Sequence, residues 1–416
     1  MADRSARKRR QGTFALSGGF LLAASAFMAS CSSSGGSSAS VPASSPSAAA
    51  SSAASASPSP SPSPSPSPSP SPSAAPTSAP FGICLSAAVT EFPVPTANSA
   101  PLGIAAGPDG ALWFGESTGN NIGRITTSGA ITEYPVPTAH SEPSFIASGP
   151  DGALWFDEGV STVNQIGRIT TGGGITEYPV PTTGSLPGAL AAGPDGAVWF
   201  AEEHLTSASG NEFGRIATGG TITEYPVPEP SAGRDTPLFV VTGPDRNLWY
   251  TVGTYDASNY PTGGAIAQVT TAGAATEYPL PAATLIPGPI VTGPDGALWF
   301  TGAPSHDIGS TTPGNLVGRI TTGGSLTEYP VASLATIGFI TLGPDGALWF
   351  TDTGGCIGRI TTSGAVTEYA IPTTSGAPFG ITTGPDGAIW FTEADGNAIG
   401  RLVPSGASST SHAVSR

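Results

Sequence analysis

A short pattern of apolar and polar residues recurs seven times between about residue 90 and residue 403. Each copy has a Gly-Pro-Asp turn followed by a short apolar segment that contains a Trp. In the first copy we expect strands near residues 102–106, 111–116, 121–127 and 130–134. Runs of about five residues rich in Ile, Val, Thr, Tyr and Trp, separated by Pro-Asp and Gly turns, are typical of β-hairpins. The pattern therefore predicts four strands per copy and no helix among the copies.

The spacing of the copies indicates how they assemble. They are marked by all seven tryptophans of the protein, Trp113, Trp155, Trp199, Trp249, Trp299, Trp349 and Trp390, which lie 41 to 50 residues apart. Four strands in such a period are typical of a β-propeller blade. A lone strand at residues 90–95 precedes the first copy, and the last copy ends at Leu402 without its fourth strand. We predict an all-β, seven-bladed β-propeller, closed by an N-terminal strand that completes the last blade and hides exposed edges.

Residues that recur in every copy are expected to be structural. The third strand of each copy carries an arginine, replaced by Gln268 in the fourth copy, and the turn aspartates and fourth-strand glutamates are as regular. We expect the tryptophans to pack between blades and these polar groups to form hydrogen bonds within and between blades. A ligand site is not expected in nearly identical form around a whole ring.

The chain before the first copy resembles an export signal followed by a tether. Residues 1–31 combine a basic start, an apolar run and a lipobox-like end at Met28-Ala29-Ser30-Cys31, which predicts lipidation of Cys31. Ordinary secretion with cleavage nearby is the alternative. Residues 32–80 are rich in Ser, Pro and Ala and should stay extended. We therefore expect a bacterial cell-surface lipoprotein with its propeller at 81–406 and a flexible tail at 407–416.

The charge of the chain limits the classes of partner that we expect, and its cysteines indicate a candidate disulfide. Removing residues 1–30 would take away five of the 14 basic side chains and one of the 29 acids, leaving a net charge of −19 and no lysine. Nucleic acids and anionic membranes bind clustered Lys and Arg, so we expect neither, apart from the lipid anchor. We expect a monomer. Cys84 and Cys356 are candidates for a disulfide across the ring closure in an oxidising compartment.

Function is expected where the copies differ. In a propeller, the connections between the second and third strands share one face with those that link consecutive blades. The former are long at 203–211, 253–264 and 303–315, and residues 229–237 lengthen the approach to the fourth blade. We therefore expect this face to bind a small molecule, peptide or protein. Candidate contact residues on it are Ser144, His204, Tyr255 and His306.

Four recurrent motifs together resemble one known family. Pro-x-x-Ile, Gly-Pro-Asp-Gly-Ala-Leu-Trp-Phe-Thr-Glu, Ile-Gly-Arg-Ile-Thr and Ile-Thr-Glu-Tyr look like the virginiamycin B lyase (streptogramin lyase) family over about residues 90–403. The resemblance implies a seven-bladed propeller. It also implies Mg-dependent elimination that opens a cyclic depsipeptide at its ester, with a histidine base in a Glu-Pro-His-Gly segment leading into an inner strand.

That segment is only partly matched in this chain. The positions that correspond to the histidine are Leu102, Ser144, Gly188, Leu238, Gly288, Ile337 or Gly338, and Phe379, and none is histidine. The second copy keeps Glu142-Pro143-Ser144 and Glu158, so Glu142 and Glu158 match the metal-ligand positions. Serine cannot replace an imidazole base near neutral pH. His140, two residues before Glu142, is the candidate catalytic base.

Two functions stay open from the sequence. The first is a non-catalytic, tethered propeller that binds a ligand or protein partner, which the missing histidine and the lipobox favour. The second is a Mg-dependent carbon-oxygen lyase, which the family resemblance and the Glu142/Glu158 pair favour. A surface array without a specific ligand is a third option.

Overall fold

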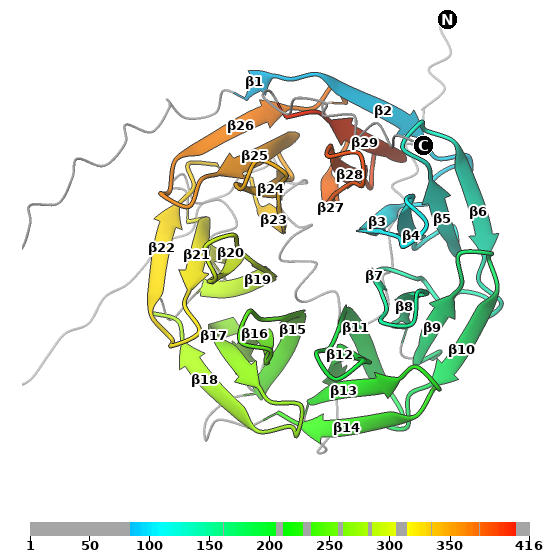
Figure 1. The fold of residues 1–416 in the computed structure, drawn as a ribbon, viewed down its shortest axis with the longest axis vertical. Coiled ribbons are helices and arrows are strands. Elements are labelled where there is room, and N and C mark those ends of the chain that lie inside the picture. Colours follow the sequence, from blue (N-terminus) through cyan, green and yellow to red (C-terminus); the bar gives the residue numbers. More distant parts are fainter. Residues whose placement is uncertain are drawn as a thin grey trace, which may run out of the picture. The chain divides into compact units, whose positions relative to one another are not determined.

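Seven small sheets surround a common axis in the described part of the chain, each with its first strand nearest the axis (Figure 1). The computed structural model describes residues 84–160, 162–204, 211–227, 234–256, 261–281, 285–304, 314–333, 335–373 and 375–404. No helix occurs among these residues, and so none that could cross a membrane. The sheets are the predicted blades, numbered here 1 to 7 from the first tryptophan.

The strands of blades 1 to 4 follow one another in chain order. Blade 1 contains β3 (Pro101–Ala106), β4 (Leu112–Glu116), β5 (Asn121–Ile125) and β6 (Ile131–Pro135). Blade 2 contains β7 (Ile146–Ser148), β8 (Leu154–Glu158), β9 (Gln165–Ile169) and β10 (Ile175–Pro179). Blade 3 contains β11 (Ser185–Ala192), β12 (Ala197–His204), β13 (Glu212–Ala217) and β14 (Ile222–Pro226). Blade 4 contains β15 (Arg234–Thr242), β16 (Leu248–Tyr255), β17 (Pro261–Val269) and β18 (Ala275–Pro279).

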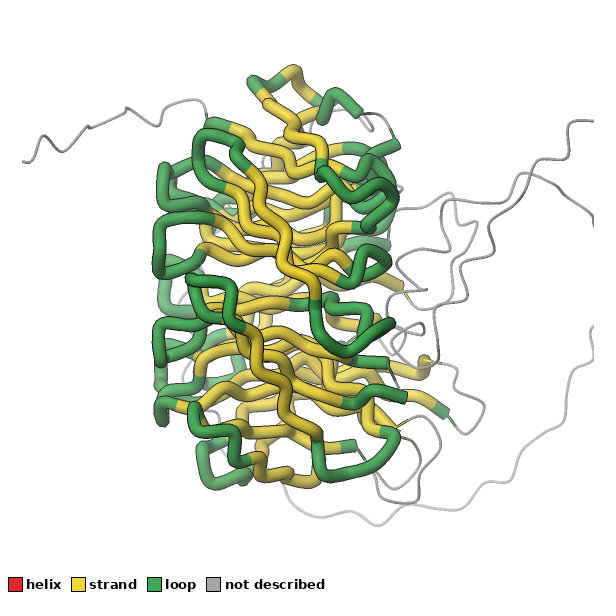
Figure 2. Tube along the Cα trace, turned by 90° about the vertical axis from the view of Figure 1, so that its right-hand side faces the viewer, coloured by secondary structure: helices red, strands yellow, loops and turns green. Residues whose placement is uncertain are grey.

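Blades 5 to 7 complete the ring. Blade 5 contains β19 (Leu285–Thr292), β20 (Leu298–Pro304), β21 (Leu316–Ile320) and β22 (Leu326–Pro330). Blade 6 contains β23 (Ile337–Leu342), β24 (Leu348–Asp352), β25 (Cys356–Ile360) and β26 (Val366–Ala370). Blade 7 contains β27 (Pro378–Thr383), β28 (Ile389–Glu393) and β29 (Ala398–Leu402), and its outer strand is β2 (Val89–Pro93). Seen from the side, strands fill the middle of the ring and the connections gather on its two faces (Figure 2).

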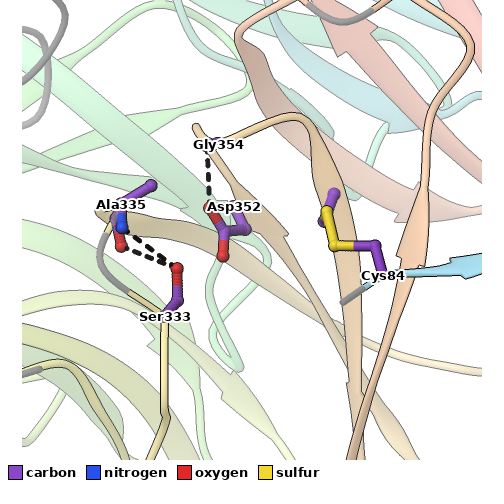
Figure 3. Close-up of a disulfide and its surroundings, with 6 residues drawn as sticks. Cys84, Ser333, Ala335, Asp352 and Gly354 are labelled. Carbon is purple, nitrogen blue, oxygen red and sulfur yellow. Dashed lines mark hydrogen bonds between the residues drawn. A yellow bond between two sulfur atoms is a disulfide. The ribbon is translucent and has the colours of Figure 1, made fainter. Parts of the chain in front are cut away.

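The ring closes as predicted, and a second N-terminal strand adds to the closure. β2 pairs antiparallel with β29, with Phe92 opposite Ile399. β1 (Leu85–Ser86) was not predicted, and it pairs parallel with β26 as a fifth strand of blade 6. A disulfide joins Cys84 to Cys356 with 6.3 Å between their Cα atoms (Figure 3). The N-terminal segment therefore contacts the last two blades.

The core lies between neighbouring blades, where the tryptophans were expected. Trp113 of blade 1 packs with Leu154 and Phe156 of blade 2, and Trp390 of blade 7 packs with Leu112 of blade 1. All seven tryptophans are at most 1% exposed. Each blade therefore buries its apolar face on the next, so that no blade has a complete core of its own.

The face formed by the first-to-second and third-to-fourth strand turns repeats one polar unit. In blade 1, Asp109 accepts a hydrogen bond from Trp113 Nε1 at 3.0 Å and another from Arg124 Nε at 2.7 Å. Burial disfavours the charge on Asp109, but these hydrogen bonds outweigh it and lower the pKa of the carboxyl. The Arg124 guanidinium lies 5.7 Å from the centroid of the Trp113 ring. The recurrent Asp, Arg and Trp therefore form the structural unit that the sequence indicated.

The fourth-strand glutamates connect blades to their neighbours. Thr96, which follows the outer strand of blade 7, donates from N and Oγ1 to Glu133 of blade 1 at 2.8 and 3.0 Å. Thr373, after blade 6, makes the same pair of bonds to Glu91 of blade 7 at 2.9 and 2.8 Å. These bonds hold the outer strands of consecutive blades together, including the pair at the closure.

Candidate functional site

Side-chain amides hold the connections in place on the face of the ring opposite the Gly-Pro-Asp turns. In blade 1, Asn120 Nδ2 donates to the carbonyls of Val136 and Thr138 at 3.2 and 3.1 Å, and its Oδ1 accepts from Ser141 N at 2.8 Å. Asn164 and Asn397 make equivalent bonds in blades 2 and 7. The second-to-third strand connections therefore share a face with the connections between blades, as expected. We call it the loop face.

The inner strands are irregular where they approach this face. In six blades the pairing of the first and second strands shifts register by a bulge, as between Pro378 and Ile381 in blade 7. In each blade, one residue of the inner strand pairs with the aromatic residue that follows the second-strand Trp. We define the axial position of the blade as the position two residues before that inner-strand residue. The axial residues are Leu102, Ser144, Gly188, Leu238, Gly288, Gly338 and Phe379. In blade 6, Ile337 pairs with Asp352, so the axial position is Gly338.

Four phenyl rings from different blades meet at the axis. Phe145, Phe239 and Phe339 each follow an axial residue, in blades 2, 4 and 6, and Phe379 is itself axial in blade 7. The Phe339 centroid lies 5.7 Å from that of Phe145, 5.4 Å from that of Phe239 and 4.8 Å from that of Phe379. Rings from blades so far apart around the ring can touch only near its centre (Figure 1). We call these four residues the phenylalanine cluster.

The rings of this cluster are differently exposed. Phe145 is 6% exposed, whereas Phe239, Phe339 and Phe379 are half-buried. Their edge-on and tilted contacts are the geometries that aromatic rings favour. Sequence reasoning did not identify the cluster. The signal was Phe after the axial position in three copies.

A buried carboxylate positions the blade 2 part of the cluster. Asp157 Oδ1 accepts hydrogen bonds from the backbone N–H of Ser144 at 3.1 Å and of Phe145 at 2.5 Å. Burial raises the pKa of Asp157 to about 7, although these N–H groups favour its charged form. Blade 4 has Thr251 at this position, and its hydroxyl accepts from Phe239 N at 3.2 Å. Sequence reasoning singled out Glu158 and missed Asp157.

The blade 2 carboxylates proposed as metal ligands have different charged neighbours. Glu158 is fully buried, and neither of its oxygens has a hydrogen-bond partner within the described structure. Burial and repulsion from the Glu177 and Asp157 carboxylates raise the pKa of Glu158 to about 8. The nearby Ser141 hydroxyl acts in the opposite direction and limits this rise. Glu142 is half-buried, which raises its pKa, and His140 opposes that shift.

The backbone around Glu142 is unusual. His140 is exposed, and both His140 and Glu142 have positive φ, 59° and 50°. Such angles are uncommon for residues other than glycine. Ser144 Oγ donates to the Glu142 carbonyl at 3.0 Å, so this hydroxyl is engaged with its own turn.

Of the remaining predicted contact residues, the structure describes the side chain of Tyr255, which lies on the loop face between blades 3 and 4. Tyr255 is 3% exposed, and the Arg234 guanidinium lies 5.8 Å from its ring centroid and 3.6 Å from Glu203 Oε1. Burial and Glu203 raise the Tyr255 pKa, against the effect of Arg234. This group links blades 3 and 4. His306 and Cys31 lie outside the described residues, as does the side chain of His204.

The long connections of blades 3 to 5 are partly strands. β16 continues to Tyr255 and pairs with β17, which begins at Pro261, so most of the 253–264 connection is a hairpin extension. β15 likewise begins at Arg234, inside the predicted long approach at 229–237. These parts of the predicted long connections are therefore strands rather than loops. Longer antiparallel pairing satisfies their backbone groups, which a loop would leave to water.

Comparison with known proteins agrees with this architecture. The profile of the virginiamycin B lyase family matches residues 82–259, 203–315 and 235–414, which together span all seven blades. The chain belongs to the virginiamycin B lyase family. A solved streptogramin B lyase is 34% identical, with a TM-score of 0.63 over 76% of this chain and 96% of that one. Virginiamycin B lyase from Staphylococcus aureus, with selenomethionine, is 33% identical, with the same TM-score over 76% of this chain and 99% of that one.

A third solved structure contains a ligand. It is a catalytically inactive histidine-to-alanine variant of the Staphylococcus aureus virginiamycin B lyase with quinupristin. It is 33% identical to this chain, with a TM-score of 0.63 over 76% of this chain and 99% of that one.

This member of the virginiamycin B lyase family also contains buried acid pairs. In five blades an acid at the end of the second strand lies near the fourth-strand glutamate, and the pairs are Glu116/Glu133, Glu158/Glu177, Glu202/Glu224, Asp352/Glu368 and Glu393/Glu91. Burial, followed by repulsion from the partner, raises the pKa of Glu393 to about 8. Blades 4 and 5 have Val252 and Gly302 in place of the first acid. The loop face thus varies in charge from blade to blade.

Proposed function

We propose that this protein is an exported, non-catalytic member of the virginiamycin B lyase family that binds an apolar cyclic or aromatic peptide over its phenylalanine cluster. The observation that carries the proposal is the set of axial residues: none is an imidazole, and phenyl rings meet at the centre of the ring. The chemistry that these residues offer at the axis is therefore apolar contact.

The half-buried rings supply the affinity. Each Å² of apolar surface that a ligand removes from water contributes about 25 cal/mol to the binding free energy. A favourable contact between two aromatic rings adds about 0.5–1.5 kcal/mol. Phe239, Phe339 and Phe379 have such surface left, and the longer strands of blades 3 and 4 rise on one side of the axis. The ligand would lie against this wall and over the rings.

No axial residue, all seven of which lie in the described part of the chain, can act as a base, which argues against turnover. Elimination requires a group that accepts a proton at the reacting carbon. Ser144 holds an axial position but bonds to the carbonyl of Glu142, and a neutral hydroxyl is a poor base. His140 is exposed and lies before the inner strand. The axial positions therefore favour binding.

A Mg-dependent carbon-oxygen lyase acting on cyclic depsipeptides is the second candidate. Glu158 favours it, because a buried carboxylate whose oxygens lack hydrogen-bond partners fits a cation ligand. In this alternative Glu142 and Glu158 would hold Mg²⁺, which would polarise the ester carbonyl. His140 would accept the proton from the substrate.

One experiment separates the two candidates. Quinupristin is titrated into the full-length protein by calorimetry and then incubated with Mg²⁺ or with EDTA. We expect binding without ring opening, and at least about tenfold weaker binding in Phe339→Leu, which keeps an apolar side chain but removes the ring. Leu85→Ala, at an exposed residue of the outer strand β1, is the matched control.

The possible outcomes differ clearly. Ring opening at unchanged mass that is lost in EDTA and in Glu158→Gln would overturn the binding proposal in favour of the lyase. Absence of binding in the wild type, or equal affinity in Phe339→Leu, would overturn the proposed ligand class.

We also propose that Cys31 is acylated and that the protein is a monomer at the bacterial cell surface. The lipobox-like end of the leader supports the anchor. We expect Cys31→Ser to move the protein from the membrane fraction to the medium. Retention of this variant in the membrane fraction would contradict lipid anchoring.

A further inference from the structure

Blade 3 differs from every other blade in the charge between its second, third and fourth strands. Glu202 on β12 pairs directly with Glu212 at the start of β13, and Glu224 lies on β14 opposite Gly214. One carboxylate oxygen from each of these residues lies within 4.8 Å of the other two. Like charges placed directly opposite one another destabilise a sheet. A counter-charge must therefore offset this arrangement.

The other blades avoid this problem at the position of Glu212. Blade 1 has Asn121 there, and its Nδ2 donates to Glu116 Oε2 at 3.3 Å. Blade 2 has Gln165. The remaining blades have apolar residues or cysteine: Ala265, Leu316, Cys356 and Ala398. An amide donor or an apolar residue is thus replaced by a third acid in blade 3 alone.

Glu202 itself indicates what neutralises the cluster. It is fully buried, and neither carboxylate oxygen has a hydrogen-bond partner within the described structure. A Cβ atom at Gly214 would collide with the Phe200 ring and with Oε1 of Glu202, so the ring and the carboxylate share the space that the glycine leaves. An unpartnered buried carboxylate that points at two others is a costly arrangement without a bound cation or proton.

A second departure from the repeat lies at the same place. Six blades have phenylalanine after the second-strand Trp, but blade 4 has Tyr250. Its hydroxyl is buried without a hydrogen-bond partner in the described structure, and Glu202 helps to raise its pKa after burial. The hydroxyl is therefore close enough to Glu202 for the two charges to interact. Two independent substitutions in neighbouring blades, Glu212 and Tyr250, thus involve the same buried carboxylate.

We propose that blade 3 binds one divalent cation, Ca²⁺, between Glu202, Glu212 and Glu224. Ca²⁺ takes six to eight oxygen ligands at about 2.3–2.6 Å, so oxygens on opposite sides of it lie about 4.6–5.2 Å apart. The separations within 4.8 Å fit this geometry. Three carboxylates supply the charge, and the half-buried sides of Glu212 and Glu224 leave room for water ligands.

The neighbouring bonds are compatible with this role. Thr182 N and Oγ1 donate to Glu224 at 3.0 and 2.9 Å, which fixes the carboxylate and leaves lone pairs on both oxygens. Burial and repulsion from Glu224 and Glu212 raise the pKa of Glu202 to about 9, so the pocket carries a proton when no cation is bound. The site is separate from the phenylalanine cluster and from Glu142 and Glu158.

The test uses the full-length protein after dialysis against EDTA. Thermal unfolding and calorimetric titration are measured with CaCl₂, MgCl₂ and MnCl₂. We expect Ca²⁺ to raise the Tm by several degrees, because a ligand that binds only the folded state stabilises it. Glu212→Gln recreates the acid-amide-acid arrangement of blade 2, so it should fold and lose this shift, with Ca²⁺ affinity lower by at least about tenfold.

Two further variants make the result specific. Glu328→Gln removes an exposed fourth-strand glutamate in blade 5, where no second-strand acid is present, and should keep the full Ca²⁺ shift. Tyr250→Phe restores the repeat residue and should weaken Ca²⁺ binding. The proposal is overturned if none of the three cations changes the Tm, if Glu212→Gln keeps the wild-type shift, or if Glu328→Gln loses as much of it.

Discussion

The two faces of the ring are built by opposite rules. One face is formed by the first-to-second and third-to-fourth strand turns, and we call it the turn face. There each blade repeats an aspartate that accepts hydrogen bonds from its Trp and from the third-strand Arg, or from Gln268 in blade 4. On the loop face the backbone is repeated, with Asn side chains bonded to the next connection, but the axial residues and second-strand acids change from blade to blade. A constant frame on one side thus permits chemical variation on the other. Single substitutions can alter the loop face without altering the fold.

The largest expected effect comes from breaking the shared frame. Trp199→Ala removes a fully buried ring at the contact of blades 3 and 4. We expect a loss of about 3–5 kcal/mol in the free energy of unfolding, because a cavity remains. Urea denaturation followed by circular dichroism measures it. A loss below 1 kcal/mol would mean that the blades do not depend on one another as the packing indicates.

The next effect tests whether Asp157 and the threonines at the same position in other blades have the same role, which is to accept hydrogen bonds from the inner-strand N–H groups. Asp157→Ala leaves the buried N–H of Phe145 and the partly buried N–H of Ser144 without an acceptor, and we expect a cost of about 1–3 kcal/mol. Asp157→Thr should recover most of this stability, because threonine fills that role in blades 4 and 7. Denaturation of both variants at pH 7 provides the comparison. Equal destabilisation by both would show that the carboxylate has a separate role.

A smaller effect concerns the acid pair in blade 7. The pKa of Glu393 is raised to about 8 in the folded protein, so the folded state binds more protons than the unfolded state between about pH 5 and pH 8. Stability should therefore fall as the pH rises through this window. Glu393→Gln should remove that part of the slope and be more stable than the wild type by about 1–2 kcal/mol at pH 8. Denaturation at pH 5 and pH 8 tests this, with Glu328→Gln as control. Equal slopes in wild type and Glu393→Gln would contradict the buried pair.

The smallest effect is expected on the turn face. Arg319→Gln copies the natural change at Gln268, whose Nε2 donates to Asp245 at 2.6 Å. A partly exposed ion pair contributes little, so we expect a loss of less than about 1 kcal/mol. Thermal unfolding at low and high salt measures it. A loss of several kcal/mol would mean that the arginines hold the blades together more than the tryptophans do.

The sequence predicted the frame because the frame is local and repeated. The tryptophan spacing, the Gly-Pro-Asp turns and the unpaired strand near residue 90 were enough for seven blades and their closure. The two-residue strand β1 has no comparable signal, since its pairing depends on tertiary contact with β26. The strand extensions to Tyr255 and from Arg234 were taken for loops because they fall outside the repeat.

The candidate sites depend more on contacts between distant segments than the frame does. Phe145, Phe239 and Phe339 lie at matched positions, but their contacts cross the axis between segments about 100 to 200 residues apart in sequence. Glu142 and Glu158 were proposed as metal ligands from the family resemblance, whereas the roles of Asp157 and of the cluster of Glu202, Glu212 and Glu224 depend on burial and register. Such properties appear only once strands are paired.

The disulfide gives the molecule a mechanical asymmetry. Tension applied to the chain ahead of Cys84 passes directly into Cys356 on β25 through a covalent link. β1 and β2 follow Cys84 in the chain, so they lie beyond the point where the force enters and are shielded from being peeled off β26 and β29. A force applied from the N-terminal side would thus act on blade 6, and the strand pairs that close the ring would not be pulled apart.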